Sequence, residues 1–398
     1  MTGQSHSRRI IHVTSPLSRS GGGIPPVIWS LAGQTQKLGS ETLVSGLKDE
    51  YFEADCGNQV VPVLGGAVRG PQAIGYSPEL YRLLKAKVRS ADLLHVHGLW
   101  SYPGRMAYRL GRSVGCRRIV SPHGMLEPWA LQNSRWKKRL AGWLFESRNL
   151  RTADCLHALC HSESENFRRY GLRNPIAVIP NGVDLETPEP GPDKEDLLSE
   201  QPALRGRKLL LFLSRVHPKK GLPELLHAWA KVKASDKNWS LLVVGPDELN
   251  HQSELSKIAT ELEITQHIHF MGPAYGPRKR LFLSAADAFA LPSFSEGFSM
   301  AVLEAAAAGL PVLLTKECNF PELATAGGAI EVRAGPVGIP EGLNQLIELS
   351  EAQRKSMGGN GLQLVASSYT WPAVAKEMMR VYDWIAKIGP KPDSVRLS

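Results

Sequence analysis

Two carboxylates, Glu296 and Glu304, stand eight residues apart around the predicted start of a helix. This segment follows the apolar run 288–291, and the helix is expected to end at Gly309. A helix amino terminus favours an anion because its first N–H groups are unpaired and its dipole is positive there. A diphosphate at this point would leave one carboxylate near each end of a nucleotide-linked sugar, as an acceptor for paired hydroxyls. The residues that would offer unpaired backbone N–H groups here are Phe298, Ser299 and Met300.

Positive charge for such a diphosphate is available in the segment 214–221. Arg215 and Lys220 follow the apolar run 209–213 and lie five residues apart across a turn. Arginine binds as a planar fork and lysine as a point charge, so the pair could hold one diphosphate from two sides as it departs. No Asp-x-Asp sequence occurs in the chain. We therefore expect neither a metal-bridged diphosphate nor any other cofactor.

Glycines and histidines in the first half of the chain could complete such a site. Gly22 and Gly23 follow the first predicted strand and would let a phosphate or sugar approach the backbone. The chain has neither GxGxxG nor GxxxxGK[ST], which removes the main support for a dinucleotide or P-loop site. His123 ends a predicted strand and could hydrogen-bond a transferred sugar. His97, with His95, ends another strand, and these two are expected either to be structural or to lie near an acceptor.

Alternating strands and helices must position these residues. Short, nearly all-apolar runs separated by amphipathic helices predict an α/β protein with two Rossmann-like domains, each a parallel sheet covered on both faces. Ligands of such sheets bind at the carboxyl ends of the strands, so we expect the chemistry in a cleft between the domains. The Pro-rich segment 186–194 is expected to link them. The runs lie at 10–14, 42–46, 59–63, 92–97, 117–121, 154–159, 176–180, 209–213, 241–244, 268–270, 288–291 and 311–314, and predicted helices include 78–88, 136–150 and 371–388.

Composition limits the class of protein and of partner. A content of 42% hydrophobic and 21% charged residues is typical of a soluble enzyme. No apolar run reaches the roughly 18 residues that span a bilayer. Residues 1–185 carry 24 Lys and Arg against 13 Asp and Glu, whereas the rest carry 23 against 25, so the first half favours an anionic partner. Basic and aromatic residues from Arg135 to Arg151 suggest peripheral contact with the inner membrane face.

One cluster of metal-ligating residue types occurs at 155–161. On a strand, Cys155, His157 and His161 would share one face while Cys160 would point away, so four ligands could not converge. We therefore predict packing within a strand and no metal site. The five scattered cysteines, with no CxxC pair, and the polar amino terminus predict a cytoplasmic protein with reduced thiols.

The combination of motifs resembles the retaining GT-B glycosyltransferases of the group 1 family, family 4 in the classification of sugar enzymes. The matching segments follow the family order between about residues 10 and 370. The amino-acid sequence of residues 122–129 is similar to that of members that build bacterial envelope or exported polysaccharides. The resemblance implies the GT-B architecture. It assigns 1–186 to an acceptor-side domain, 187–370 to a nucleotide-sugar-binding domain, and 371–398 to a helix that crosses back to the first domain.

The resemblance also implies roles for the residues already named. Glu296 would bind the transferred sugar and Glu304 the ribose of the nucleoside. His97 stays a candidate acceptor contact. The residues implied to hold the diphosphate and the donor sugar are Gly22, Gly23, His123, Arg215, Lys220, Gly297, Phe298 and Ser299.

The expected activity is metal-independent transfer of a hexose, with UDP-glucose as the best guess for the donor, to a saccharide or lipid-linked acceptor in polysaccharide biosynthesis. The acceptor would attack on the face that the nucleotide leaves, which retains the anomeric configuration. Two alternatives stay open: a non-catalytic nucleotide- or nucleic-acid-binding protein, and a GT-B sugar-nucleotide epimerase. Glu296 and Glu304 argue against nucleic acid because carboxylates repel its phosphates. An epimerase would need acid and base groups that the sequence does not single out.

Overall fold

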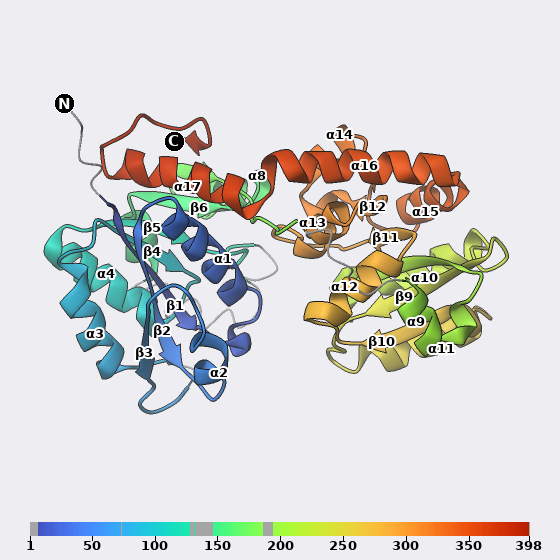
Figure 1. Cartoon of the computed structure of the whole chain (residues 1–398), viewed down its shortest axis with the longest axis horizontal. Helices are drawn as coiled ribbons and strands as arrows, with labels where there is room; N and C mark the ends of the chain where they lie inside the picture. Colours follow the sequence, from blue (N-terminus) through green and yellow to red (C-terminus); the bar gives the residue numbers. More distant parts are fainter. Residues whose placement is uncertain (1–6, 73, 128–130, 132–145, 186–193, 398) are drawn as a thin grey trace. The chain divides into compact units, whose positions relative to one another are not determined.

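The structure is a computed structural model that describes residues 7–72, 74–127, 131, 146–185 and 194–397. The chain divides into two compact units, one made of residues 1–182 with 371–398 and the other of residues 183–370 (Figure 1). Each unit holds a parallel sheet with helices packed on it, which confirms the predicted α/β class with two Rossmann-like domains. Among the helices of the described ranges, none combines the length and the apolar character needed to cross a membrane.

The first unit is built on a sheet of eight strands. Its strands in chain order are β1 (Arg9–Pro16), β2 (Glu41–Lys48), β3 (Val63–Ala67), β4 (Leu93–His97), β5 (Arg117–Ser121), β6 (Cys155–Ala158), β7 (Ile176–Val178) and β14 (Val395–Arg396). Their order in the sheet is β14-β7-β6-β5-β4-β1-β2-β3, and β14 alone runs antiparallel to its neighbour. The carboxyl ends of the seven parallel strands therefore share one edge of the sheet.

Helices cover both faces of this sheet. They are α1 (Ile24–Lys37), α2 (Phe52–Cys56), α3 (Pro78–Val88), α4 (Tyr102–Val114), α7 (Ser147–Arg151), α8 (His161–Arg169) and α17 (Trp371–Ile385). The hydroxyls of Ser77 and Ser101 cap α3 and α4 by accepting the N–H groups of Leu80 and Gly104. Both helices also begin with proline in the first turn, where a missing N–H costs nothing.

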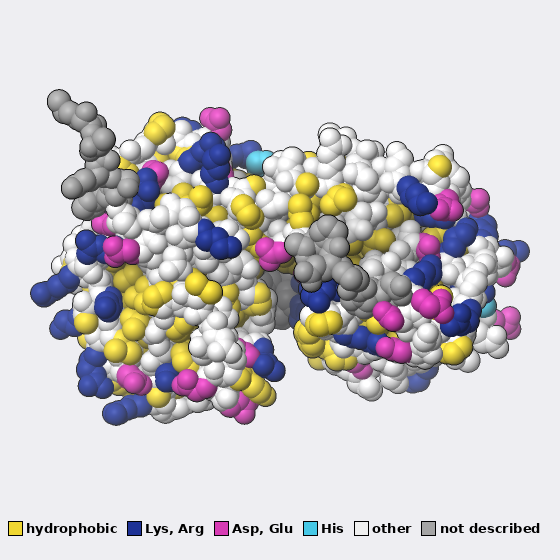
Figure 2. All heavy atoms as spheres, in the orientation of Figure 1, with side chains coloured by type: hydrophobic (Ala, Val, Ile, Leu, Met, Phe, Trp, Pro, Cys, Tyr) yellow, Lys and Arg dark blue, Asp and Glu magenta, His cyan; other side chains and the backbone are white. Residues whose placement is uncertain are grey.

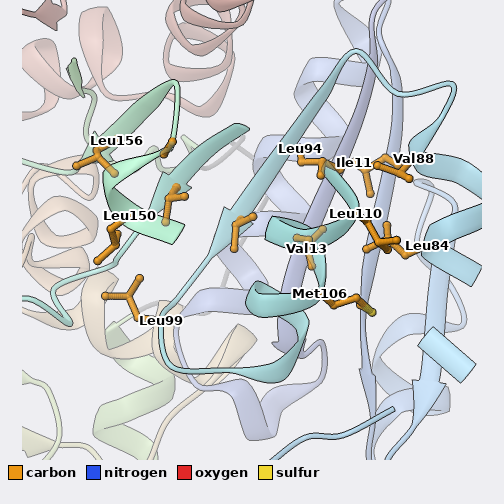
Figure 3. Close-up of a cluster of buried hydrophobic side chains, with 14 of the residues drawn as sticks. Ile11, Val13, Leu84, Val88, Leu94, Leu99, Met106, Leu110, Leu150 and Leu156 are labelled. Atoms are coloured by element: carbon orange, nitrogen blue, oxygen red, sulfur yellow. The ribbon is translucent and has the colours of Figure 1, made fainter. Parts of the chain in front are cut away.

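Alternation along the strands sends side chains into two separate hydrophobic layers. Ile11 and Val13 of β1 belong to a core that also contains Leu84 of α3 and Leu110 of α4 (Figure 3). Ile10 points to the opposite face, where α17 supplies much of the apolar surface. Helix α17 follows the second unit in the sequence and yet completes the core of the first.

The second unit has a six-stranded, wholly parallel sheet in the order β10-β9-β8-β11-β12-β13. Its strands are β8 (Lys208–Leu213), β9 (Trp239–Val244), β10 (Ile268–Gly272), β11 (Ala288–Leu291), β12 (Val312–Thr315) and β13 (Ala329–Val332). Its helices are α9 (Lys194–Glu200), α10 (Leu222–Lys231), α11 (His251–Glu261), α12 (Gly276–Ala285), α13 (Met300–Ala307), α14 (Pro321–Thr325), α15 (Gly338–Glu348) and α16 (Glu351–Ser368). The central strands are buried along almost their whole length, as their continuous apolar sequences predicted.

The predicted strand at 59–63 is wrong, because the strand forms at Val63–Ala67 and Val60 is 87% exposed. Two of the five residues of β3 are glycines, so its sequence does not show the alternation of apolar side chains that marks a strand. They are needed for packing: a Cβ on Gly65 would stand 2.3 Å from the Phe52 ring, and a Cβ on Gly66 would stand 2.5 Å from the side chain of Leu80.

The strand argument for the Cys and His cluster at 155–161 also needs correction. Strand β6 ends at Ala158, and His161 is the first residue of α8, so His157 and His161 do not share a strand face. Most of the predicted helix 136–150 lies outside the described residues, and so do the linker residues 186–193. The basic segment from Arg135 is described only from residue 146 onward.

Candidate active site

Two loops meet at the carboxyl edge of the second sheet. Strands β8 and β11 are neighbours, so the loops 214–221 and 292–299 leave the sheet next to each other. The Phe294 N–H donates to the carbonyl oxygen of Lys219 over 2.8 Å, and the hydroxyl of Ser293 donates to the same oxygen over 3.1 Å. The structure thus brings together the basic segment and the acidic segment that the sequence singled out.

Glycine is required where these loops approach other backbone. Gly221 has a φ of 73°, and a Cβ there would stand 2.0 Å from the carbonyl oxygen of Pro292. Gly245, directly after β9, has a φ of 150°, and its Cβ would stand 1.8 Å from the carbonyl oxygen of Ser214. Gly245 was not among the predicted site residues. A glycine that immediately follows a buried apolar strand was the signal that could have found it.

A nearly buried ion pair joins the two loops. Lys220 Nζ donates to Glu296 Oε1 over 2.5 Å, and the two side chains are only 7% and 11% exposed. Each charge compensates the other where water is largely excluded. Asn319 fixes the acidic segment, since its Nδ2 donates to the carbonyls of Glu296 and Gly297 over 2.6 and 3.2 Å. A cation and a carboxylate are therefore held side by side at the predicted diphosphate and sugar positions.

The other two predicted charges have partners that the sequence did not reveal. Arg215 Nη1 lies 2.9 Å from both carboxylate oxygens of Glu248, and its side chain is half-exposed. Glu304 Oε1 accepts a hydrogen bond from Lys279 Nζ over 2.7 Å. The Arg215–Glu248 pair is exposed enough to contribute only about 0–1 kcal/mol, so a ligand phosphate can replace Glu248 at small cost.

Helix α13 (Met300–Ala307) begins two residues later than the sequence predicted, with Ser299 as its cap. The Ser299 hydroxyl accepts the N–H of Val302 over 3.4 Å, and the helix stops just before Gly309, which has a φ of 72°. The ring of Phe298 packs on Phe320 with ring centroids 5.3 Å apart. Burial of that ring anchors the turn that carries the backbone amides of residues 297–299.

The glycine loop of the first unit forms a short 3-10 turn before α1. Gly22 has a φ of 67°, and Gly23 caps α1. A Cβ at either position would meet no heavy atom of the described residues within 4 Å, so space is open in front of this helix start. Gly21, which the sequence analysis did not select, is the sterically constrained member, because its Cβ would lie 2.7 Å from the carbonyl oxygen of Pro16.

A row of histidines crosses the carboxyl half of the first sheet. His12 Nδ1 lies 2.9 Å from His97 Nε2, and His97 Nδ1 lies 3.0 Å from His123 Nε2. The ring of His97 is buried and both of its nitrogens are bonded, so this arrangement does not offer it to an acceptor. His97 therefore supports the ring of His123, and its place near an acceptor stays a prediction.

The protonation of this row follows from burial. Desolvation lowers the pKa of His12 and of His123 to about 3, and holds the pKa of His97 well below its ordinary value. Each ring is therefore neutral at pH 7 and carries one proton. His12 Nε2 is buried with no partner among the described residues, and a buried orphan N–H is rarer than an orphan acceptor. We infer that the protons sit on Nδ1 along the row, so His123 keeps an Nδ1–H donor.

A second hydrogen-bonded chain runs beside the first. His95 Nδ1 lies 2.7 Å from the Tyr382 hydroxyl of α17, and His95 Nε2 lies 2.6 Å from the Ser121 hydroxyl. The same hydroxyl lies 2.7 Å from His157 Nδ1, whose other nitrogen bonds the carbonyl of Ile179. These bonds account for His95 and His157 as structural groups, and they tie α17 to the centre of the sheet.

Three of these rings have the spacing of a shared cation site. His12, His95 and His97 can each offer a nitrogen, and these nitrogens lie within 4.8 Å of one another. This group was not predicted from the sequence, because its members come from two strands, β1 and β4, that are distant in the sequence. In this structure the nitrogens of His95 and His97 are used in hydrogen bonds to protein groups.

Glu163 fixes the backbone that carries His123. His123 has a φ of 53° and Gly124 a φ of 75°, a left-handed pair that a histidine adopts only at some cost. Glu163 Oε1 accepts the N–H of Gly124 over 2.7 Å, and its Oε2 accepts the N–H of Leu159 over 2.7 Å. The carboxyl group is 1% exposed, and burial raises its pKa to about 7. The nearby carboxylate of Glu127 raises that pKa further.

The raised pKa predicts a pH dependence of stability. The folded protein holds this proton up to about pH 7, whereas the unfolded chain loses it near its ordinary value of 4.5. The unfolding free energy should therefore fall as pH rises through this window, by on the order of 3 kcal/mol from this group. In Glu163→Gln that part of the slope should vanish, as thermal unfolding between pH 5 and 8 would measure. Glu165→Gln, on the exposed face of the same helix, should keep the wild-type slope; equal slopes in all three proteins would contradict the assignment.

Comparison with known proteins agrees with this geometry. The chain matches the family model of glycosyl transferases group 1 over residues 193–363 and that of the glycosyl transferase 4-like domain over residues 22–182. A D-inositol 3-phosphate glycosyltransferase of Corynebacterium urealyticum is 26% identical over 93% of both chains. A GDP-mannose:cellobiosyl-diphosphopolyprenol alpha-mannosyltransferase of Xanthomonas oryzae is 25% identical, over 80% of this chain and 82% of its own.

Comparison with solved structures agrees with the family matches. HepE of Anabaena, solved in complex with UDP, superposes with a TM-score of 0.75 at 18% identity, over 95% of this chain and all of its own. Both halves of the chain thus match domains of one family, and the two parallel-sheet units match the GT-B architecture. The protein is therefore a glycosyltransferase that belongs to the group 1 family, family 4, with the GT-B fold.

Proposed function

We propose that the protein transfers a hexose from a UDP-sugar, with UDP-glucose as the first candidate, to a saccharide or lipid-linked acceptor in polysaccharide biosynthesis. The observation that supports this most is the Lys220–Glu296 pair, which holds a cation and a carboxylate side by side at the junction of two loops. The cation suits a diphosphate, and the carboxylate suits the hydroxyls of the sugar attached to it. UDP bound in the Anabaena structure supports UDP as the nucleotide, whereas the name of the Xanthomonas relative makes GDP the competing nucleotide.

The proposed reaction needs no metal ion. Three sources of positive potential lie on one edge of the second sheet: Arg215, Lys220 and the amino terminus of α13. Together they would stabilise the charge that develops on the diphosphate as it leaves. His123 would donate from Nδ1 to a hydroxyl of the transferred sugar.

The proposed stereochemistry is retention. The acceptor oxygen forms its bond to the anomeric carbon on the face from which the bond to the diphosphate oxygen breaks. The departing β-phosphate takes the proton of the acceptor hydroxyl, so no separate protein base is required. Determination of the anomeric configuration of the product by NMR tests this step, and inversion would refute it.

The donor site predicts which nucleotide stabilises the fold. A ligand that binds only the folded protein raises its Tm with concentration and affinity. UDP should raise Tm more than GDP or ADP, EDTA should not change the shift, and Arg215→Ala should abolish most of it. Arg205→Ala removes an exposed arginine elsewhere in the second unit and serves as the control. A shift that EDTA removes would refute the metal-free site, and no shift with any nucleotide would refute the donor site itself.

We also propose that the protein contacts the inner membrane face peripherally. The segment from Arg135 to Arg151 would bring the protein to the anionic surface where a lipid-linked acceptor lies. Flotation with anionic vesicles at low salt tests it, and absence of binding under those conditions would refute it.

A further inference from the structure

A cavity of about 600 Å³ opens on the first unit, away from the residues discussed so far. It lies at the carboxyl ends of β3 and β4, the edge at which open parallel sheets bind ligands. The loop after β3 forms one wall and the first turns of α3 and α4 form the others. The residues that define it are Arg69, Tyr76, Tyr81, Tyr102, Arg105 and Arg109.

The lining of this cavity is positive. Arg105 and Arg109 lie four residues apart on α4 and therefore on one face of that helix, and Arg69 comes from the facing loop. No Asp or Glu occurs among the described residues that line the cavity. Helices α3 and α4 both begin here, so the positive ends of two helix dipoles add to the three guanidinium groups. Figure 2 shows Lys and Arg side chains over the left side of the first unit, interspersed with Asp and Glu.

An aromatic and apolar wall adjoins these cations. The rings of Tyr76 and Tyr102 meet edge to face with centroids 5.0 Å apart. Met106 is buried beneath them, and Ile74 at the rim is 58% exposed. The N–H of Arg69 donates to the carbonyl of Tyr76 over 2.7 Å, which closes the loop that carries both residues. A ligand that fits this lining carries an anionic group joined to a saccharide ring or an apolar chain.

We propose that this cavity binds the phosphate or diphosphate group of the acceptor, with the attached saccharide or prenyl portion against Tyr76 and Tyr102. Arg69, Arg105 and Arg109 bind the phosphate oxygens. This inference rests on the proposed function, because it assigns a substrate to the same reaction. The acceptor class is then a phosphorylated one, either a soluble sugar phosphate or a lipid diphosphate, and a neutral free saccharide does not belong to it.

Direct binding tests the cavity without turnover. The probes are inositol 1-phosphate and geranyl diphosphate, each compared with its neutral analogue, inositol or geraniol, by calorimetry on the whole protein. The anionic probe should bind and its neutral analogue should not. Arg105→Gln with Arg109→Gln should weaken binding about tenfold or more for each arginine removed. Arg82→Gln, which removes an exposed arginine of α3 outside the cavity, should bind as the wild type does.

The two anionic probes distinguish a soluble acceptor from a lipid-linked one. Binding of the sugar phosphate alone identifies a soluble acceptor, and binding of the prenyl diphosphate alone identifies a lipid-linked one. Wild-type affinity in the double variant, or equal binding of the neutral analogues, overturns the proposal. Tm and circular dichroism of the double variant check that it folds. If UDP gives no stabilisation while the anion still binds through Arg105 and Arg109, the proposed function fails and the anion site stands.

Discussion

Replacing Lys220 by Met should lower kcat for sugar transfer by about 10²–10³-fold, the usual effect of removing one charge-stabilising group from a preorganised site. Lys220 is only 7% exposed, so its charge acts in a medium that screens it little. The variant loses the cation that would face the leaving diphosphate and leaves the carboxylate of Glu296 buried without its partner. Steady-state transfer kinetics measure the first effect, and Tm measures the second.

A second substitution tests how much of the lost Tm comes from the unpaired carboxylate of Glu296. Breaking one side of a buried ion pair costs roughly 3–5 kcal/mol, whereas replacing both partners by neutral groups is often close to neutral. Lys220→Met combined with Glu296→Gln should therefore recover most of the lost Tm and none of the lost transfer. Lys231→Met, which removes an exposed lysine at the end of α10, is the control for charge alone. If the double variant regained activity with its stability, Lys220 would have a structural role only.

The fold could be predicted from the sequence wherever a strand is apolar throughout. Strand β8 and strand β11 were found within one residue because burial on both faces leaves no polar interruption. Strand β3 was misplaced, since Gly65 and Gly66 carry no apolar side chain to mark it. Strand β14 has only two residues and pairs with β7 across more than 200 positions of sequence, a contact that no local pattern encodes.

The candidate site also contains residues that could be predicted from the sequence and residues that could not. The acidic and basic motifs were visible because their chemistry is carried by adjacent residues at the end of a strand. The partners that orient them were not visible: Asn319 clamps the acidic segment from another loop, and Glu163 binds Gly124 from a helix 39 positions later. Such contacts depend on sheet order, which single-sequence periodicity does not determine. The histidine row was missed for this reason, although His97 and His123 were both noted.

The histidine row predicts a graded loss of activity. His123→Ala should cause the largest fall in kcat, about 10²-fold or more, because it removes the proposed donor to the sugar. His97→Phe keeps the volume of the ring but cannot hold His123 Nε2, so we expect a fall of about tenfold, in line with one lost hydrogen bond. His97→Gln retains groups that can bond His123 and should recover part of that loss. Transfer kinetics with the same donor measure the series.

Coupling between the two positions decides whether His97 acts through His123. If His97 only orients His123, then His97→Phe should cost almost nothing further in a protein that already carries His123→Ala, and the two losses should be far from additive. A merely structural His97 would lower Tm to the same extent in both backgrounds and would leave kcat per folded molecule unchanged. Additive losses in kcat would instead mean that His97 contributes by a route independent of His123. Because the ring of His97 is buried with both nitrogens bonded, we expect the non-additive result.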